Sequence, residues 1–174
     1  MQWPAPEHDD QSRHPIRYCP PSGGAPVFAT SDGKAVFFPR PWLPRDETPD
    51  ETYPFLLNTG RLQHQWHTLT KTGRVPQLNK LNAAPFVEIA PDDAQKLGLR
   101  NKDSVKISSS RGVAILPAHI STRVAPGTCF APFHWNDRFG RLLCMNALTS
   151  DATDPVSLQP GIKYCAVSLT RAPI

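Results

Sequence analysis

Proline is distributed unevenly along this chain, and this limits what its first residues can fold into. Ten of the 20 prolines lie among residues 1–52. Proline fixes φ and removes a backbone hydrogen-bond donor, so a stretch this rich in proline is disfavoured as regular helix or central sheet. We therefore expect residues 1–52 to form an extended, proline-rich arm and residues 53–174 to form the folded domain.

One part of the arm has a pattern of local structure. Asp32-Gly33 lies between two short apolar runs within residues 26–38. An Asp-Gly pair favours the tight turn that joins two antiparallel strands. We expect a short hairpin here, and its aromatic side chains indicate that it packs on another surface.

From residue 53 onward the pattern is that of several short strands and one helix. Apolar runs or polar–apolar alternation predict strands at residues 53–58, 86–89, 104–108, 113–118, 127–133 and 164–169. Residues 91–98 begin with proline, carry acids in the first turn and end in glycine, which predicts a helix. Short strands, one helix and long loops together indicate a small β-barrel.

Composition favours a soluble protein. Hydrophobic residues make up 39% of the chain and charged residues 20%, and no apolar run approaches the roughly 20 residues of a membrane span. No secretory signal is visible. The cysteines form no C-x-x-C pair and have apolar flanks, which favours reduced, buried thiols in a cytoplasmic protein over a disulfide or a metal site. They are Cys19, Cys129, Cys144 and Cys165.

The loop at residues 59–73 has the chemistry best suited to a ligand. It lies in the acid-free stretch between Glu51 and Glu88, where the cations are Arg61, Lys71, Arg74 and Lys80. Glycine allows close backbone approach, an arginine fork matches a pair of phosphate oxygens, and hydroxyls and amides can donate to the rest. Trp66 offers a flat face to a heterocycle. The loop therefore fits a ligand that carries a diphosphate.

Other interpretations of this loop remain open. His64 and His67 could bind a metal, but no cysteine or carboxylate is near them in sequence. As acid and base they would need a nucleophile or an activated water, and the chain has no G-x-S-x-G or Cys-His signature. It also has no G-x-G-x-x-G or Walker A motif, so a common nicotinamide or nucleoside-triphosphate site is not expected. They can equally be structural histidines on a solvated basic face. The same loop also suits a nucleic-acid-binding β-barrel, although the net charge of +4 is low for that role.

Two later segments add polar and aromatic groups. Residues 133–137 interleave aromatic and polar side chains after a predicted strand. Residues 145–163 form a connection too long for a hairpin, and loops of this length are usually functional or disordered. The alternative is a cover over the end of the barrel, in which Asn146 and Asp154 cap turns.

Several motifs follow one another in a familiar order and spacing. They are Thr59-Gly60-Arg61, Gln65-Trp66-His67-Thr68, Thr70-Lys71-Thr72-Gly73, Pro85-Phe86-Val87-Glu88-Ile89, Pro91-Asp92-Asp93-Ala94, Ser110-Arg111-Gly112, Asn146-Ala147-Leu148-Thr149, Asp154-Pro155-Val156-Ser157 and Gln159-Pro160 with Lys163. As an ensemble they resemble the C-terminal domain of molybdopterin oxidoreductases, in particular the assimilatory nitrate reductase branch. The resemblance covers residues 26–170. It departs from the family at Pro160-Gly161-Ile162, where an acidic residue and an aromatic are common before the lysine.

The resemblance implies both a fold and a ligand. The fold is mainly β, a six-stranded double-psi β-barrel with one or more short helices. The ligand is a molybdenum-bis(molybdopterin guanine dinucleotide) cofactor, bound at its guanine dinucleotide parts. The positions that match the family's cofactor contacts are Thr59, Gly60, Arg61, His64, Gln65, Trp66, His67, Thr68, Phe133, Asn146 and Lys163.

The resemblance also implies partners. The family's iron-sulfur cysteines and molybdenum ligand belong to other domains, so we expect no catalytic and no metal-binding residue in this chain. Its expected partners are the remaining domains of a parent reductase and an electron-donor domain or protein. By itself the chain is not expected to catalyse a reaction, to bind nucleic acid or to span a membrane.

Overall fold

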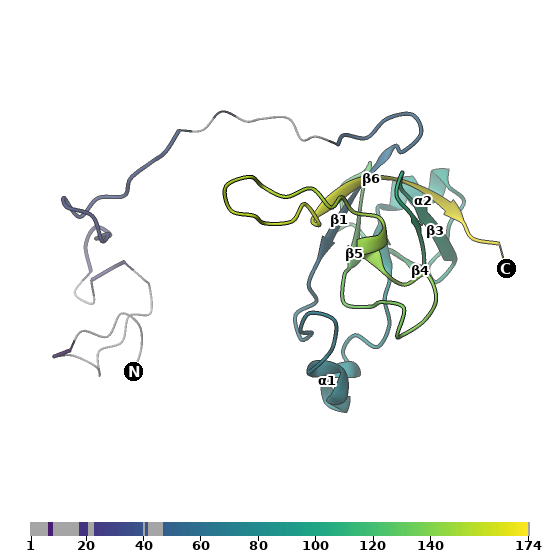
Figure 1. Ribbon diagram of the computed structural model, residues 1–174, viewed down its shortest axis with the longest axis horizontal. Helices are drawn as coiled ribbons and strands as arrows, with labels where there is room; N and C mark the ends of the chain where they lie inside the picture. The colour runs from purple at the N-terminus through teal and green to yellow at the C-terminus, as the bar shows by residue number, and fades with distance from the viewer. Residues whose placement is uncertain (1–6, 9–17, 21–22, 40, 42–46, 174) are drawn as a thin grey trace. The chain divides into compact units, whose positions relative to one another are not determined.

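The computed structural model describes residues 7–8, 18–20, 23–39, 41 and 47–173. The chain divides into two compact units, Met1–Pro44 and Arg45–Ile174. Within the described residues, every helix and strand lies in the second unit, which is drawn from blue to yellow in Figure 1.

In the first unit, the described residues 23–39 form a turn without flanking strands. The Phe28 N–H donates to the Gly33 carbonyl at 2.8 Å, and Gly33 has a left-handed φ of 69° that suits glycine. The turn expected at Asp32-Gly33 is therefore present, but the runs on either side of it pair with nothing as strands in this range. A two-stranded hairpin alone is marginal in water, and Phe37 is 87% exposed.

The second unit is a closed six-stranded barrel. Its strands are β1 (Phe55–Gly60), β2 (Val87–Ile89), β3 (Ser104–Ser108), β4 (Val113–Ile120), β5 (Thr128–Pro132) and β6 (Tyr164–Arg171). Their order around the barrel is β1-β5-β2-β4-β3-β6, and β6 pairs back to β1. The pairs β1–β5 and β2–β4 are parallel and the others antiparallel. Exchanging the first three strands for the last three leaves this pattern unchanged, as in a double-psi β-barrel.

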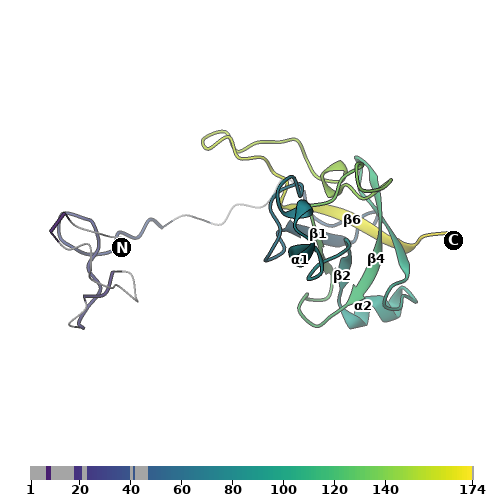
Figure 2. The same cartoon turned by 90° about the horizontal axis from the view of Figure 1, so that it is seen from below.

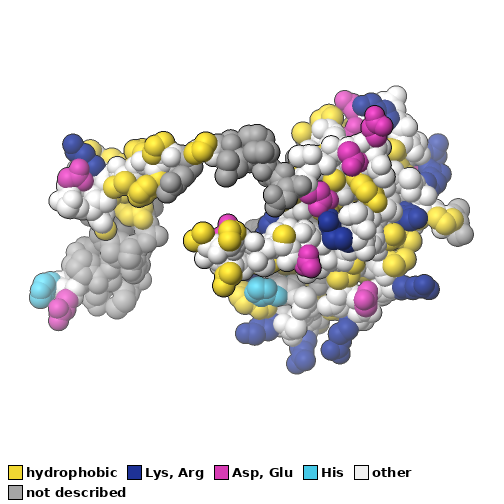
Figure 3. Space-filling view, turned by 45° about the horizontal axis from the view of Figure 1, so that its top comes forward, with side chains coloured by type: hydrophobic (Ala, Val, Ile, Leu, Met, Phe, Trp, Pro, Cys, Tyr) yellow, Lys and Arg dark blue, Asp and Glu magenta, His cyan; other side chains and the backbone are white. Residues whose placement is uncertain are grey.

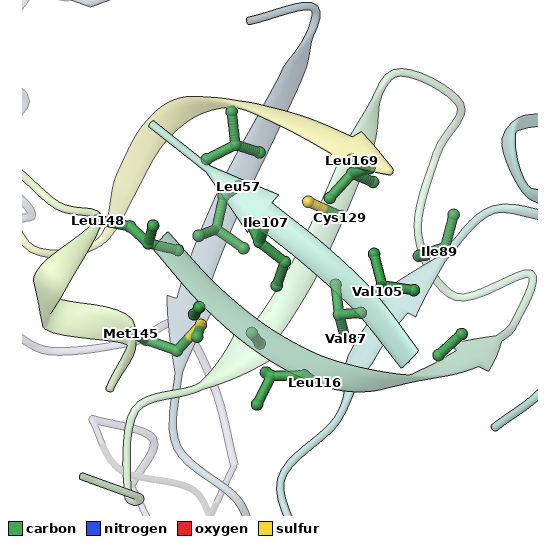
Figure 4. Packing of buried hydrophobic residues seen from close by; sticks show 14 of the residues in the cluster. Leu57, Val87, Ile89, Val105, Ile107, Leu116, Cys129, Met145, Leu148 and Leu169 are labelled. Atoms are coloured by element: carbon green, nitrogen blue, oxygen red, sulfur yellow. The ribbon is translucent and has the colours of Figure 1, made fainter. Parts of the chain in front are cut away.

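The core fills the inside of the barrel, and Figure 4 shows its side chains converging between the strands. Leu57, at the centre of β1, is fully buried and lies between Cys129 of β5 and Cys165 of β6. Strands β3 and β4 alternate buried and more exposed residues, because successive side chains of a strand point to opposite faces. Met145 and Leu148 join the same cluster from the long connection between β5 and β6.

The helices are short, and one of them is anchored to the barrel. Helix α2 (Pro91–Lys96) forms as the sequence predicts, with Gly98 following it at a φ of 64°. Asp93 is buried, and its carboxylate accepts the Gly127 N–H at 2.6 Å just before β5. In the described part of the chain, no helix has the length and apolarity of a membrane span.

Three further turns of helix were not expected from the sequence. They are η1 (Thr72–Arg74), α1 (Pro76–Asn79) and η2 (Met145–Ala147). Elements of three or four residues are too short to show a hydrophobic period, so no sequence pattern could reveal them.

The thiols are free, and burial makes two of them unreactive. Burial raises the pKa of Cys129 far above its usual range and that of Cys165 to about 11, with the Glu47 carboxylate as a second cause at Cys165. At pH 8 only about one thousandth of Cys165 is thiolate, the reactive form. We expect alkylation at pH 8 to label the half-buried Cys19 and Cys144 first, as mass spectrometry would show. Equally fast labelling of all four would contradict this packing.

Candidate functional site

The loop after β1 starts where two parallel strands end side by side. Strands β1 and β5 finish at Gly60 and Pro132, which are partners in the sheet. The Thr59 N–H donates to the Lys163 carbonyl at 2.9 Å, and the Phe133 N–H donates to the Gly60 carbonyl at 3.2 Å. Four of the residues predicted from the sequence, Thr59, Gly60, Phe133 and Lys163, are thus held together by backbone hydrogen bonds.

Gly60 has a steric reason to be glycine. A Cβ added there would lie 2.8 Å from the ring of Phe130, closer than real Cβ atoms come to other atoms. The ring of Phe130 therefore packs directly on the backbone at the start of the loop.

Two cations lie over aromatic rings at the site. Lys163 Nζ is 4.7 Å from the centre of the Phe133 ring, and Arg61 Cζ is 5.3 Å from that of Trp66. Trp66 is 43% exposed, and His67 meets its ring edge-on at 4.4 Å. Cation–π contacts at exposed sites contribute about 0.5–1 kcal/mol, less than a charge-assisted hydrogen bond to a phosphate. Both cations are therefore available to an anionic ligand.

His134 is a central residue of the site, yet it was absent from the predicted positions. It is fully buried; its Nε2 accepts the Leu62 N–H at 2.9 Å, and its Nδ1 lies 2.5 Å from the His67 carbonyl oxygen. Since Nε2 accepts, the proton is on Nδ1, which donates to that carbonyl. The only sequence signal was a histidine flanked by two aromatics after a predicted strand.

The electrostatics around His134 keep it neutral. Burial is the largest cause that lowers its pKa below the usual 6.5. The hydrogen bond to the His67 carbonyl opposes this effect, while Arg61 and His67 lower the pKa further. A neutral imidazole can accept at one nitrogen and donate at the other, which is the arrangement observed.

The middle of the loop leaves one buried acceptor without a partner. Gln65 is 5% exposed; its Nε2 donates weakly to Asn79 Oδ1 at 3.4 Å, and Asn79 Nδ2 donates to the Gly73 carbonyl at 2.8 Å. Gln65 Oε1 is buried with no hydrogen-bond partner among the described residues. Such orphaned groups are rare in folded proteins. His67 and Leu69 also have positive φ values of 42° and 64°, so the loop is conformationally unusual.

The remaining predicted residues lie farther from this cluster. His64 is half-buried, and Thr68 is exposed beside a cleft of about 550 Å³ that Arg74 and Arg138 also line. Asn146 is exposed on η2, next to the turn between β3 and β4. The structure therefore links the 59–68 loop with Phe133 and Lys163, and Asn146 stands outside the described contacts that connect them.

A second cleft, of about 770 Å³, is lined in part by Lys163. Arg111, on the turn between β3 and β4, pairs there with both oxygens of Glu47 at 2.6 and 2.9 Å. The Glu47 carboxylate also accepts the Ala166 N–H at 2.7 Å, and Arg111 Nε donates to the Leu148 carbonyl at 2.9 Å. This ion pair fastens the segment before β1 to β6 and to the end of η2.

The connection between η2 and β6 projects from the barrel instead of covering its end, as Figures 1 and 2 show. Asp154 orders it: one carboxylate oxygen accepts the Val156 and Ser157 N–H groups at 3.1 and 2.6 Å. These bonds, with one from the Ser157 hydroxyl, hold the pKa of Asp154 below its usual value. Asp154 thus caps a turn, as expected. Figure 3 shows apolar side chains on the projecting loop, where Val156 and Leu158 are 91% and 72% exposed.

The donor set of the site fits a dinucleotide with a diphosphate. Arg61 and Lys163 carry positive charge, Gly60 allows close approach, Trp66 offers a ring face, and the loop contains no carboxylate to repel an anion. Lys and Arg side chains also lie along the lower edge of the barrel unit in Figure 3. Among the described residues, no three His, Cys, Asp or Glu side chains come together as a metal site would require.

Comparisons with known proteins agree with this chemistry. Residues 55–166 match the family model described as "Molydopterin dinucleotide binding domain". The chain is 41% identical over 157 residues to a "Nitrate reductase" of Symbiobacterium thermophilum, which covers 89% of this chain and 20% of the relative. It is 38% identical over 182 residues to the "Periplasmic nitrate reductase" of Desulfovibrio desulfuricans, which covers 98% of this chain and 23% of the relative.

A solved structure supports the fold. The acetylene hydratase of Pelobacter acetylenicus superposes with a TM-score of 0.56 at 19% identity, over 69% of this chain and 18% of that one. The chain thus spans only about a fifth of the length of the relatives that it matches. The family match leaves the nucleic-acid-binding alternative without support. With its barrel and its dinucleotide-compatible loop, the chain belongs to the family of molydopterin dinucleotide binding domains.

Proposed function

We propose that the 59–68 loop, with Phe133, Asn146 and Lys163, binds the guanine dinucleotide parts of a molybdenum-bis(molybdopterin guanine dinucleotide) cofactor. The observation that carries this proposal is the meeting of Gly60, Arg61 and Lys163 at the adjacent ends of β1 and β5. Arg61 and Lys163 bring two cations to this end of the barrel, and the 59–68 loop itself contains no carboxylate. In the neighbouring clefts, Glu88 is paired with Arg123 and Glu47 is paired with Arg111. The family to which the chain belongs supports the same ligand class.

Each side chain has a role that its chemistry suggests. Arg61 and Lys163 would leave their aromatic rings and pair with phosphate oxygens, since charge-assisted bonds are the stronger contacts. Trp66 would present its exposed ring to the base. Gln65 Oε1, the orphaned acceptor, would receive an N–H when the loop adjusts to the ligand. His64, His67, Thr59, Thr68 and Asn146 would complete the polar lining.

The parent protein, in this proposal, is a larger oxidoreductase of the nitrate reductase type. Two relatives carry that name, and the chain spans about a fifth of them. The bound cofactor would supply the molybdenum at which nitrate is reduced. The residues of this chain hold its nucleotide ends, while other domains provide the iron-sulfur ligands and the entry for electrons from a donor domain or protein.

The assimilatory type and a cytoplasmic location are also part of the proposal. The four free thiols support a reducing compartment. One relative is a periplasmic nitrate reductase, so location stays a prediction about this protein rather than a property shared by its relatives.

Replacing Arg61 tests the binding site. In the complete parent reductase, Arg61→Ala should weaken cofactor binding by at least about tenfold, because a charged hydrogen bond contributes about 1.5–3 kcal/mol. Molybdenum by mass spectrometry, and guanine nucleotide released on denaturation, would both fall per mole of protein. Arg100→Ala, at an exposed arginine after α2, is the matched control and should keep its cofactor. Full occupancy in Arg61→Ala would refute the assignment.

A further inference from the structure

We propose that His134 is a positioning residue for the 59–73 loop: the neutral imidazole holds the loop in shape for the dinucleotide, and protonation releases it. The part that concerns the dinucleotide rests on the proposed function. The part that concerns the loop itself stands independently, because it follows from the protein's own hydrogen bonds.

One side chain joins two points of the loop that lie apart in sequence. His134 follows β5 and is fully buried, and it bonds the backbone at Leu62 and at His67. These are the places where the loop leaves β1 and where its backbone enters a left-handed conformation. Both bonds are made to backbone groups, so they fix the path of the chain whatever the loop side chains do.

The described loop has few other constraints across this stretch. The Trp66 N–H donates to the Thr72 hydroxyl at 3.0 Å, and the Leu69 N–H donates to the Trp66 carbonyl at 2.9 Å. Both of these bonds lie within the loop and tie it only to itself. Gln65 Nε2 also ties the loop weakly to Asn79 of α1, at 3.4 Å. Among the described residues beyond Gly60, His134 provides the hydrogen bonds that connect residues 62–67 to the barrel.

Protonation would reverse one of the two bonds. An imidazolium carries N–H groups on both nitrogens, so Nε2 would face the Leu62 N–H donor to donor. The charged or titratable groups that act on His134 are Arg61 and His67, both on the loop. Both lower the pKa of His134, so neither compensates a buried positive charge on it. The loop must therefore move away when His134 takes a proton.

The direction of the pH dependence follows from the lowered pKa. A group whose pKa is lower in the folded state contributes stability above its unfolded value and loses it as the pH falls. The loop should therefore be fully ordered above pH 6.5 and should loosen progressively below it. A loop whose order does not depend on the protonation of His134 would show no such transition.

Nuclear magnetic resonance of the 174-residue chain, without cofactor, can test this directly. With ¹⁵N-labelled histidine, His134 should show the Nδ1–H tautomer and a midpoint below 6.5. Amide exchange at Leu62 should rise about tenfold in His134→Leu, as expected for one lost hydrogen bond. His134→Gln keeps one donor and one acceptor, so it should restore protection and abolish the acid transition. His119→Gln, at an exposed histidine on β4, is the matched control.

Two outcomes would overturn the proposal. One is a wild-type His134 that shows the Nε2–H tautomer or titrates at or above 6.5, a result that needs no variant to fold. The other is an acid transition of the loop that persists in His134→Gln. Cofactor release from the intact parent reductase, followed by guanine nucleotide in solution as pH falls, tests the remaining link. If the loop titrates but release is independent of pH, the proposed ligand site fails while the role of His134 in the loop stands.

Discussion

Leu57→Ala should cost about 4 kcal/mol of the free energy of unfolding. Leu57 is fully buried in the middle of β1, between Cys129 and Cys165 on the two neighbouring strands. A barrel closed on every side by hydrogen-bonded strands cannot collapse into the space that the side chain leaves. Because domains of this size are stable by only about 5–15 kcal/mol, urea unfolding followed by circular dichroism should show a much lower midpoint.

Leu158→Ala provides the comparison for this change. Leu158 is 72% exposed on the projecting loop, so the same truncation should alter stability by no more than about 0.5 kcal/mol. Similar losses for the two leucines would mean that the interior of the barrel is not packed as described.

Gly112→Val should destabilise the protein by about 3 kcal/mol through overpacking. A Cβ at Gly112 would lie 2.5 Å from the carbonyl oxygen of Ala147, a backbone atom that cannot rotate away. To relieve the contact, η2 must move, and it carries the buried Met145 and precedes the buried Leu148. A substitution on the turn outside the barrel therefore disturbs the packing of the core through η2.

Ser110→Val introduces the same side chain two residues earlier, at an exposed position of the same turn. It should leave the thermal midpoint nearly unchanged, whereas Gly112→Val should lower it by several degrees. If Gly112→Val were as stable as Ser110→Val, the close approach of η2 to the turn would be wrong.

Much of the barrel was predictable from local patterns. All six strands carry their own apolar run or alternation and lie within two residues of the predicted bounds. Helix α2 was predicted because proline, acids and Gly98 each act over a single turn. The order of strands around the ring was not derivable this way, since it depends on pairings between distant segments. Only the barrel type was predicted, and that rested on the resemblance alone.

The sequence predicts which residue types make up the candidate site, but not the hydrogen bonds and loop paths that assemble it. Gly60, Arg61 and Trp66 predict a ligand-binding loop, because their chemistry is unusual in one short stretch, and that assignment stays a prediction. The role of His134 was hidden, since its two partners are backbone groups far away in sequence and backbone groups leave no trace in residue identity. The projection of residues 151–161 was likewise hidden, because an Asp154-capped turn can cover a surface or extend from it.

The pairing of β1 has a consequence for the newly made chain. Both of its neighbours, β5 and β6, are translated well after it, so the first strand leaves the ribosome with two bare edges and an apolar face. Unpaired apolar strands recruit strands from other molecules. A message cut short before Tyr164 would therefore yield a chain with exposed edges on β1 and β3, prone to aggregate, and not a smaller working domain. Chaperones that cover nascent strands have their clearest target here in residues 55–60.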